Sequence, residues 1–302
     1  MNDPLILEIR GNSLDDGPGI RSVVFFKGCP LSCVWCHNPE SKRAAAELSF
    51  DPDQCVACNT CLARCERTAL ARKRPGFIDR NKCARCFACA DACPSGALSR
   101  VGRAMRVSEV AEAVLRDLPF FRNSGGGVTL SGGEPTLFMD FSAELLLTVR
   151  RQRVHTLLET CGLFDWDEFS RTMLPHLDAV FFDIKLMDTA AHRRQCGVPN
   201  ELILANFTRL LECGGTPAVL PRTPLVPGIT DTDENLSAIA DFLLGLGVSR
   251  AALLPYNPMW HGKSAKIGSS DPTAKDAALA AWQDTATIER CRAIFTRRGI
   301  AV

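Results

Sequence analysis

The sequence predicts an α/β protein, a partial (β/α)6 barrel interrupted by a small cysteine-rich domain. Short apolar runs alternate with amphipathic stretches through residues 103–302, and 11 of the 15 cysteines fall between Cys29 and Cys93. Such alternation indicates a parallel sheet with helical crossovers. The absence of a nucleotide-binding G-x-G-x-x-G favours a barrel over a doubly wound sheet. We therefore expect residues 1–43 and 103–302 to form the barrel and residues 44–102 to form an insert.

Six strands are predicted from short apolar runs, each followed by an amphipathic stretch. The runs are Arg21–Lys27, Gly127–Leu130, His155–Glu159, Ala179–Lys185, Ala218–Arg222 and Ala251–Pro255. Helices are predicted near residues 107–119, 138–152, 165–174, 199–212, 231–245 and 275–298. In barrels of this kind the chemistry lies at the carboxyl ends of the strands.

Charge and hydropathy exclude several classes of protein. The formal net charge of +1 offers no long-range attraction to nucleic acid or to an anionic membrane. No apolar run approaches the length of a membrane span. The start of the sequence, residues 1–4, lacks the basic and apolar regions of a signal peptide. We expect a cytoplasmic monomer that binds neither nucleic acid nor membrane.

The first cysteine motif follows the first predicted strand, with the spacing C-x3-C-x2-C at Cys29, Cys33 and Cys36. Three thiolates in one short loop can hold three irons of a cubane cluster and leave the fourth iron open for a substrate. The alternative is a zinc site, but zinc requires four ligands in a closed structural site. His37 adjoins Cys36 and is badly placed to share a metal with it.

The insert contains an internal repeat, in which two cysteine runs follow each other with the same spacing. Both runs match the C-x2-C-x2-C-x3-C pattern of bacterial ferredoxins. The members of the first run, Cys55, Cys58, Cys61 and Cys65, correspond in order to Cys83, Cys86, Cys89 and Cys93. In two-cluster ferredoxins the fourth cysteine of each run ligates the other cluster. One 4Fe–4S cluster is therefore expected on Cys55, Cys58, Cys61 and Cys93, and the other on Cys83, Cys86, Cys89 and Cys65.

Four cysteines lie outside these motifs. Cys161, Cys196, Cys213 and Cys291 are scattered along the barrel sequence. Free cysteine behaves most often as a small buried hydrophobic residue, so we expect all four to be buried and to bind no metal.

The first cysteine motif resembles the signature of the radical S-adenosylmethionine (SAM) superfamily. Trp35 occupies the aromatic position before the third cysteine, and Gly132, Gly133 and Glu134 follow the second predicted strand. This Gly-Gly-Glu-Pro stretch resembles the motif that holds the amino group of SAM. The resemblance implies a TIM-like radical SAM barrel.

Further motifs resemble the activating enzymes of glycyl radical enzymes, in the subclass that carries extra clusters. They are Asp15–Arg21, Gly28-Cys29-Pro30, Cys36–Glu40, Glu159–Gly162, Asp183-Ile184-Lys185 and Val226-Pro227-Gly228. They occur in the order found in the family and cover nearly the whole chain. The resemblance implies three 4Fe–4S clusters, SAM, a glycyl radical enzyme as protein substrate, and a flavodoxin- or ferredoxin-type electron donor.

The resemblance also assigns roles to single residues. It places Glu159 near the methionine part of SAM, and Asp183 and Lys185 against SAM and the glycine loop of the partner. Val226 joins the SAM contacts through its motif. Asn257 stands where many relatives carry histidine and is the expected ribose contact. We expect His261 to be a plain surface histidine, with a substitute ribose contact as the alternative. The competing interpretation of Asp183 and Lys185 is a structural ion pair at a strand end.

The implied reaction is reductive cleavage of SAM to a 5′-deoxyadenosyl radical, which abstracts hydrogen from a glycine Cα of the partner. The insert would relay electrons to the first cluster, or would be purely structural. Two other functions remain open at this point. One is a radical SAM enzyme that acts on a small molecule or on another peptide site, and the other is an electron-transfer iron–sulfur protein.

Overall fold

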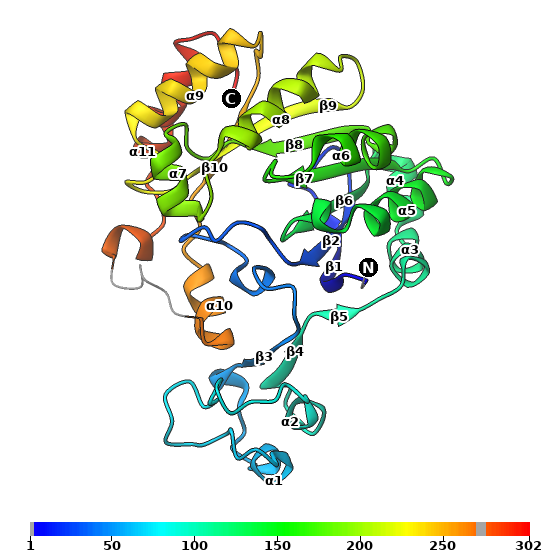
Figure 1. The fold of residues 1–302 in the computed structure, drawn as a ribbon, viewed down its shortest axis with the longest axis vertical. Coiled ribbons are helices and arrows are strands. Elements are labelled where there is room, and N and C mark those ends of the chain that lie inside the picture. The colour runs from blue at the N-terminus through cyan, green and yellow to red at the C-terminus, as the bar shows by residue number, and fades with distance from the viewer. Residues whose placement is uncertain (1–2, 270–275) are drawn as a thin grey trace.

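The structure, a computed structural model, describes residues 3–269 and 276–302. Its main sheet has eight strands in the order β10-β9-β8-β7-β6-β2-β1-β5 (Figure 1). The strands are β1 Leu5–Ser13, β2 Arg21–Lys27, β5 Arg103–Ala104, β6 Gly127–Gly132, β7 His155–Thr160, β8 Ala179–Asp183, β9 Ala218–Leu225 and β10 Ala252–Pro255. The strands from β2 to β10 in this order pair in parallel, so the predicted set of six parallel strands is confirmed.

Helices connect these strands. They are α3 Val107–Leu115, α4 Leu118–Ser124, α5 Met139–Arg150, α6 Trp166–Thr172, α7 Thr189–Cys196, α8 Glu201–Glu212, α9 Asp233–Gly245, α10 Trp260–Ile267 and α11 Thr285–Thr296. Short 3₁₀ segments span Pro39–Ser41, Pro52–Gln54, Pro135–Phe138, Leu174–His176 and Ala277–Ala280. Among the described residues, no helix is long and apolar enough to cross a membrane.

Several elements differ from the prediction. Strand β1 was not predicted because it runs antiparallel along β2 near the sheet edge and only Ile6 among its side chains is buried, which leaves a weak apolar pattern. The predicted helix at residues 107–119 is two helices, since Pro119 begins a new first turn in α4. The predicted helix at 275–298 is a 3₁₀ segment followed by α11, and its first residue, Lys275, lies outside the described residues. Helices α7 and α10 were not predicted.

The cysteine-rich segment lies at one end of the molecule, beyond α10 (Figure 1, cyan). It contains β3 Glu47–Phe50, β4 Leu98–Val101, α1 Thr60–Arg64 and α2 Ala88–Asp91. Strands β3 and β4 pair with each other in an antiparallel ladder. A small apolar core, which includes Phe77 and Phe87, packs beneath them.

The internal repeat is visible in the backbone of this segment. Residues with positive φ recur at equivalent positions of the two halves, at 57 and 85, at 59 and 87, and at 68 and 96. The strand pairings are exchanged between the halves, because Phe50 pairs with Leu98 while its counterpart Ile78 pairs with Leu70. The segment is therefore a pseudo-twofold unit in which each half completes the other.

A buried ion pair joins the barrel to the segment. The ammonium of Lys27, at the end of β2, lies 2.8 Å from the Glu47 carboxylate at the start of β3, and its side chain is 0% exposed. The Arg43 guanidinium reaches the same carboxylate over 3.3 Å from the surface. On the other side, α10 is tied to the segment by Lys266, whose ammonium lies 2.7 Å from Asp51.

We expect Lys27→Met to lower the free energy of unfolding by about 3 kcal/mol, because it leaves a buried carboxylate with only a surface partner. Arg43→Met is the matched control, and should cost less than about 1 kcal/mol because its guanidinium is exposed. Guanidinium unfolding of the anaerobically reconstituted protein measures both. Equal losses in the two variants would contradict the prediction.

Candidate functional site

A cavity of about 270 Å³ lies where the six parallel strands end. Every one of these strands, or the loop after it, contributes to the wall. The lining residues are Cys29, Leu31, Cys33, Trp35, Cys36, His37, Asn38, Ser131, Gly132, Gly133, Glu159, Thr160, Cys161, Asp183, Lys185, Arg222, Pro224 and Leu254. Thiols and ionised groups of both signs face one space, which suits a ligand that carries both charges.

The loop after β2 brings Cys29, Cys33 and Cys36 together on this wall. Two of its amides donate to carbonyls in the last turn of α7, over 2.8 and 2.9 Å. The ammonium of Lys42 donates to the Cys33 carbonyl over 2.7 Å. The loop is thus fixed at both sides, and its three thiols share one cavity.

The thiols fit a cubane cluster better than a single ion. Within residues 3–269 and 276–302, no three His, Cys, Asp or Glu side chains group closely enough to hold one metal ion. Four zinc ligands at about 2.3 Å from the metal would lie within about 4 Å of one another. A cubane spreads its thiolates over separate irons. The donor set therefore fits a 4Fe–4S cluster with one iron left without a cysteine ligand.

Two cysteines that the sequence left without a role lie beside this loop. Cys161 and Cys196 belong to the same buried cluster as Cys33, and Cys29 packs against that cluster. Both are buried, as predicted, and so is Cys291. The prediction for Cys213 was wrong, because it lies exposed at the end of α8.

The glycines after β6 are required by close packing. A Cβ on Gly133 would lie 2.1 Å from the Gly28 carbonyl oxygen, and one on Gly132 would lie 2.6 Å from the Phe26 nitrogen. The Gly133 amide donates to the Phe26 carbonyl over 2.8 Å. The pair thus lets β6 approach the start of the first cysteine loop, and its bare backbone faces the cavity.

Glu134 has its carboxylate directed away from the cavity. The side chain is buried, and its oxygens accept from the Cys161 amide over 2.7 Å and from the Thr160 hydroxyl over 3.0 Å. It also accepts from the Thr136 hydroxyl over 2.8 Å. Glu134 therefore ties the loop after β6 to the loop after β7, and the cavity wall beside it is formed by the glycines.

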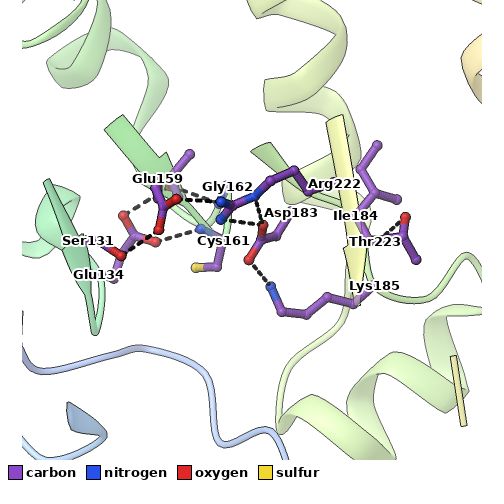
Figure 2. Close-up of polar contacts among 11 residues, drawn as sticks. Ser131, Glu134, Glu159, Cys161, Gly162, Asp183, Ile184, Lys185, Arg222 and Thr223 are labelled. Carbon is purple, nitrogen blue, oxygen red and sulfur yellow. Dashed lines mark hydrogen bonds and ion pairs between the residues drawn. The ribbon is translucent and has the colours of Figure 1, made fainter. Parts of the chain in front are cut away.

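A row of charged side chains crosses the cavity floor (Figure 2). The Arg222 guanidinium lies between two carboxylates, bonding to Glu159 and, over 3.0 Å, to Asp183. The Ser131 hydroxyl donates to Glu159 over 2.5 Å, and the Lys185 ammonium donates to Asp183 over 3.1 Å. Two carboxylates and two cations alternate, so the row is neutral overall.

Protonation in this row follows from its neighbours. Burial acts to raise the pKa of Asp183, but the charges of Lys185 and Arg222 outweigh it and hold that pKa below its ordinary value. Burial also opposes the charge on Arg222, yet Asp183 and Glu159 raise the pKa of its guanidinium. Asp183 therefore stays an acceptor at neutral pH. The predicted strand extends to Lys185, whereas β8 ends at Asp183, and both side chains still face the cavity.

Arg222 was missed by the sequence analysis. It stands at the last position of the predicted strand 218–222, and β9 continues beyond it to Leu225. The rule that barrel chemistry lies at strand ends could have singled it out. It has no motif of its own, because its role depends on carboxylates from β7 and β8.

Of the remaining residues that were predicted to contact SAM, some line the cavity and others do not. Trp35 lines the cavity. Val226 is buried beside the cavity wall, and the side-chain oxygen of Asn257 accepts from the Met259 amide over 2.9 Å. Val226, Asn257 and His261 are not among the residues that line the cavity. The ring nitrogen of His261 lies 2.7 Å from the Leu279 carbonyl.

The cysteines of the insert gather in two groups, each around its own hollow. We name Cys55, Cys58, Cys61 and Cys93 the first thiol group, and they line one hollow. We name Cys65, Cys83, Cys86 and Cys89 the second thiol group, and they line the other. Each group draws its fourth member from the opposite run, which is the grouping that the ferredoxin pattern predicts.

Comparison with known families adds independent findings. Residues 79–243 match the family described as the radical SAM superfamily, and residues 15–68 match one described as a 4Fe–4S single cluster domain. The fold is similar to that of SuiB from Streptococcus suis bound to its precursor peptide. That likeness has a TM-score of 0.52 at 13% identity, and covers 89% of this chain and 43% of SuiB.

Full-length relatives are closer in sequence. The chain is 44% identical over 260 residues to the isethionate sulfite-lyase activating enzyme of Nitratidesulfovibrio vulgaris, covering 84% of each protein. It is 39% identical over 276 residues to the benzylsuccinate synthase activating enzyme of Thauera aromatica, covering 89% of this chain and 83% of that one. It is 36% identical over 295 residues to the choline trimethylamine-lyase activating enzyme of Oleidesulfovibrio alaskensis, covering 95% and 94%.

The charged row generates a prediction for Arg222. Replacing it by Met leaves Glu159 and Asp183 facing each other in a buried site with one cation fewer. We expect SAM affinity to fall about tenfold or more, because the two carboxylates lose the charged hydrogen bonds, of about 1.5–3 kcal/mol, that align them toward the ligand. Equilibrium dialysis of SAM against the anaerobically reconstituted protein measures the change.

Arg150→Met is the matched control. Arg150 pairs with Asp178 over 2.6 Å, at the opposite end of β8 from the cavity. Its loss should leave SAM affinity within about twofold. If both variants bind SAM equally, the row is a structural feature and not a ligand site.

Proposed function

This chain belongs to the activating enzymes of glycyl radical enzymes within the radical SAM superfamily, and we propose that its three cysteine sets hold three 4Fe–4S clusters with separate tasks. It is an oxidoreductase that uses an iron–sulfur cluster and SAM to generate a radical on a partner glycyl radical enzyme. Its relatives activate several different partner enzymes, so the resemblance assigns the class of partner.

The main support for this function is that Cys29, Cys33 and Cys36 face the same cavity as the charged row. In our proposal these thiolates hold the cluster at which SAM binds. When bound, the cluster and SAM supply the reducing electron and the radical that removes hydrogen from the partner's glycine.

The residues of the chain bind and orient SAM in this proposal. The bare backbone of Gly132 and Gly133 permits close approach to the amino acid end of the ligand. Lys185 offers an ammonium to a carboxylate, while Asp183 and Glu159 accept from amino or hydroxyl groups. Trp35 closes one side and excludes water. The amino acid end of SAM carries one positive and one negative charge, and the row offers partners of the opposite sign to both.

The insert, residues 44–102, is proposed to be a ferredoxin-like domain inserted into a barrel formed by residues 1–43 and 103–302. Support comes from the two thiol groups, each with four members. It also comes from the exchanged strand pairings and the repeated positive φ values. We propose that these clusters relay electrons from a flavodoxin- or ferredoxin-type donor to the SAM cluster.

The first prediction from this proposal concerns iron. Three cubanes correspond to about 12 irons per chain after anaerobic reconstitution. Replacing Cys29, Cys33 and Cys36 with Ala should leave about eight irons and abolish 5′-deoxyadenosine formation from SAM. The exposed Cys213→Ala is the control and should keep about 12. A wild-type content near four would mean that the insert holds no cluster.

The second concerns the exchanged ligands. Cys65→Ala combined with Cys86→Ala removes two ligands from the second thiol group and should leave about eight irons. Cys65→Ala combined with Cys58→Ala leaves both insert clusters with three ligands, so its iron content should fall closer to four. The reverse order of iron contents would show that each run serves its own cluster.

A further inference from the structure

The two halves of the insert differ in surface charge at equivalent positions. Because the two halves repeat, each position near one thiol group has a counterpart near the other. Four positions are cationic near the second thiol group and uncharged near the first. The pairs are Arg64 with Ala92, Arg67 with Ser95, Lys82 with Gln54, and Arg85 with Ala57.

Each thiol group takes its fourth cysteine from the opposite run, so all four cations lie beside cysteines of the same group. Arg64 and Arg67 flank Cys65 and line the hollow of the second thiol group. Lys82 adjoins Cys83, and Arg85 lies between Cys83 and Cys86 in sequence. All four side chains are exposed, and so is Cys86. We name these four residues the basic surface.

The charges of the basic surface are not used inside the fold. Among the described residues, no carboxylate forms an ion pair with any of them, and Glu66 is the one acidic residue that lines the adjoining hollow. Other cations of the insert are engaged. Arg72 donates to Asn59 over 3.0 Å and to the Cys55 sulfur of the first thiol group over 3.2 Å. Arg74 pairs with Asp79 over 2.8 Å, and Arg100 stacks on Phe87.

Holding a cluster does not require these charges. The first thiol group has the same four cysteines in the same backbone and carries none of the four cations. The four cations of the basic surface are therefore not required by the repeated backbone itself.

The second thiol group also lies next to a cavity that it shares with a residue of the barrel. Cys83 and Arg85 line a cavity of about 530 Å³ that Lys42 also lines. Lys42 in turn donates to the carbonyl of Cys33, in the loop of the SAM site. The group thus extends from the exposed Cys86 to the side that faces the barrel.

We propose that the basic surface is the docking surface of an acidic one-electron donor protein, with the second thiol group receiving the electron. This rests on the proposed function, since it requires a cluster on that group. One electron passes from the reduced centre of the donor to the cluster. The donor is oxidised by one electron, and the cluster is reduced by one electron. No atom is transferred. Complementary charge steers such encounters and aligns the two redox centres.

The test makes the second half of the insert resemble the first. The variant Arg64→Ala, Arg67→Ser, Lys82→Gln, Arg85→Ala introduces only residues that the counterpart positions already carry. A control removes four exposed arginines from the outer helices of the barrel: Arg116→Ala, Arg122→Ala, Arg151→Ala, Arg171→Ala. Both variants lose four positive charges, so their net charges are equal.

The probe is a recombinant, strongly acidic bacterial flavodoxin. Calorimetry measures its binding to the reconstituted protein, and stopped-flow absorbance measures cluster reduction by its reduced form. At low ionic strength we expect the basic-surface variant to bind at least tenfold more weakly, and the control variant to stay within twofold. Wild-type affinity should fall as salt is added. Iron content and reduction by a small photoreductant should be unchanged in both variants.

Other outcomes overturn the inference in distinguishable ways. Equal binding by all three proteins, with about 12 irons in each, would reject the docking surface and leave the proposed function standing. An equal loss of rate with the photoreductant would mean that the charges tune the cluster instead. Weaker binding of the partner glycyl radical enzyme alone would assign the surface to that partner. A wild-type content near four irons would reject the proposed function and this surface with it.

Discussion

The close approach of two backbones determines where the chemistry can occur. Strand β6 ends against the end of β2, where the Gly133 amide bonds to Phe26 and the Glu134 amide bonds to Gly28, each over 2.8 Å. There is no room for a side chain between them. The first cysteine loop begins at this contact, so the position of its thiols relative to the other strand ends is set by close backbone packing.

Charge balance is the second constraint on the site. Glu159, Asp183, Arg222 and Lys185 come from three neighbouring strands and are largely shielded from water. Each carboxylate alone would be costly to bury in ionised form. Their alternation with two cations keeps them ionised and aligned before any ligand binds, so a ligand that carries charges of both signs finds acceptors and donors already oriented.

The sequence predicted what is encoded locally. Cysteine spacing indicated all three thiol sets, and the internal repeat indicated the pairing of the insert halves. Features that depend on distant partners were missed. The role of Arg222 depends on carboxylates from β7 and β8. Cys161 and Cys196 matter because they lie beside the first cysteine loop, and α10 contacts the insert through the ion pair of Lys266 with Asp51. Glu134 belongs to a recognisable motif, yet its orientation follows from amides of the next loop and could not be inferred from that motif.

The exchanged strands of the insert also bear on how such a domain is inherited. Its two connections to the barrel lie side by side, because Glu47 pairs with Val101, so the barrel tolerates the whole unit as a single loop. Within the unit, Phe50 needs Leu98 and Ile78 needs Leu70. A deletion that removed one half would strip the other of its strand partner. Evolution can therefore gain or discard the two halves together, but cannot readily trim the domain to one of them.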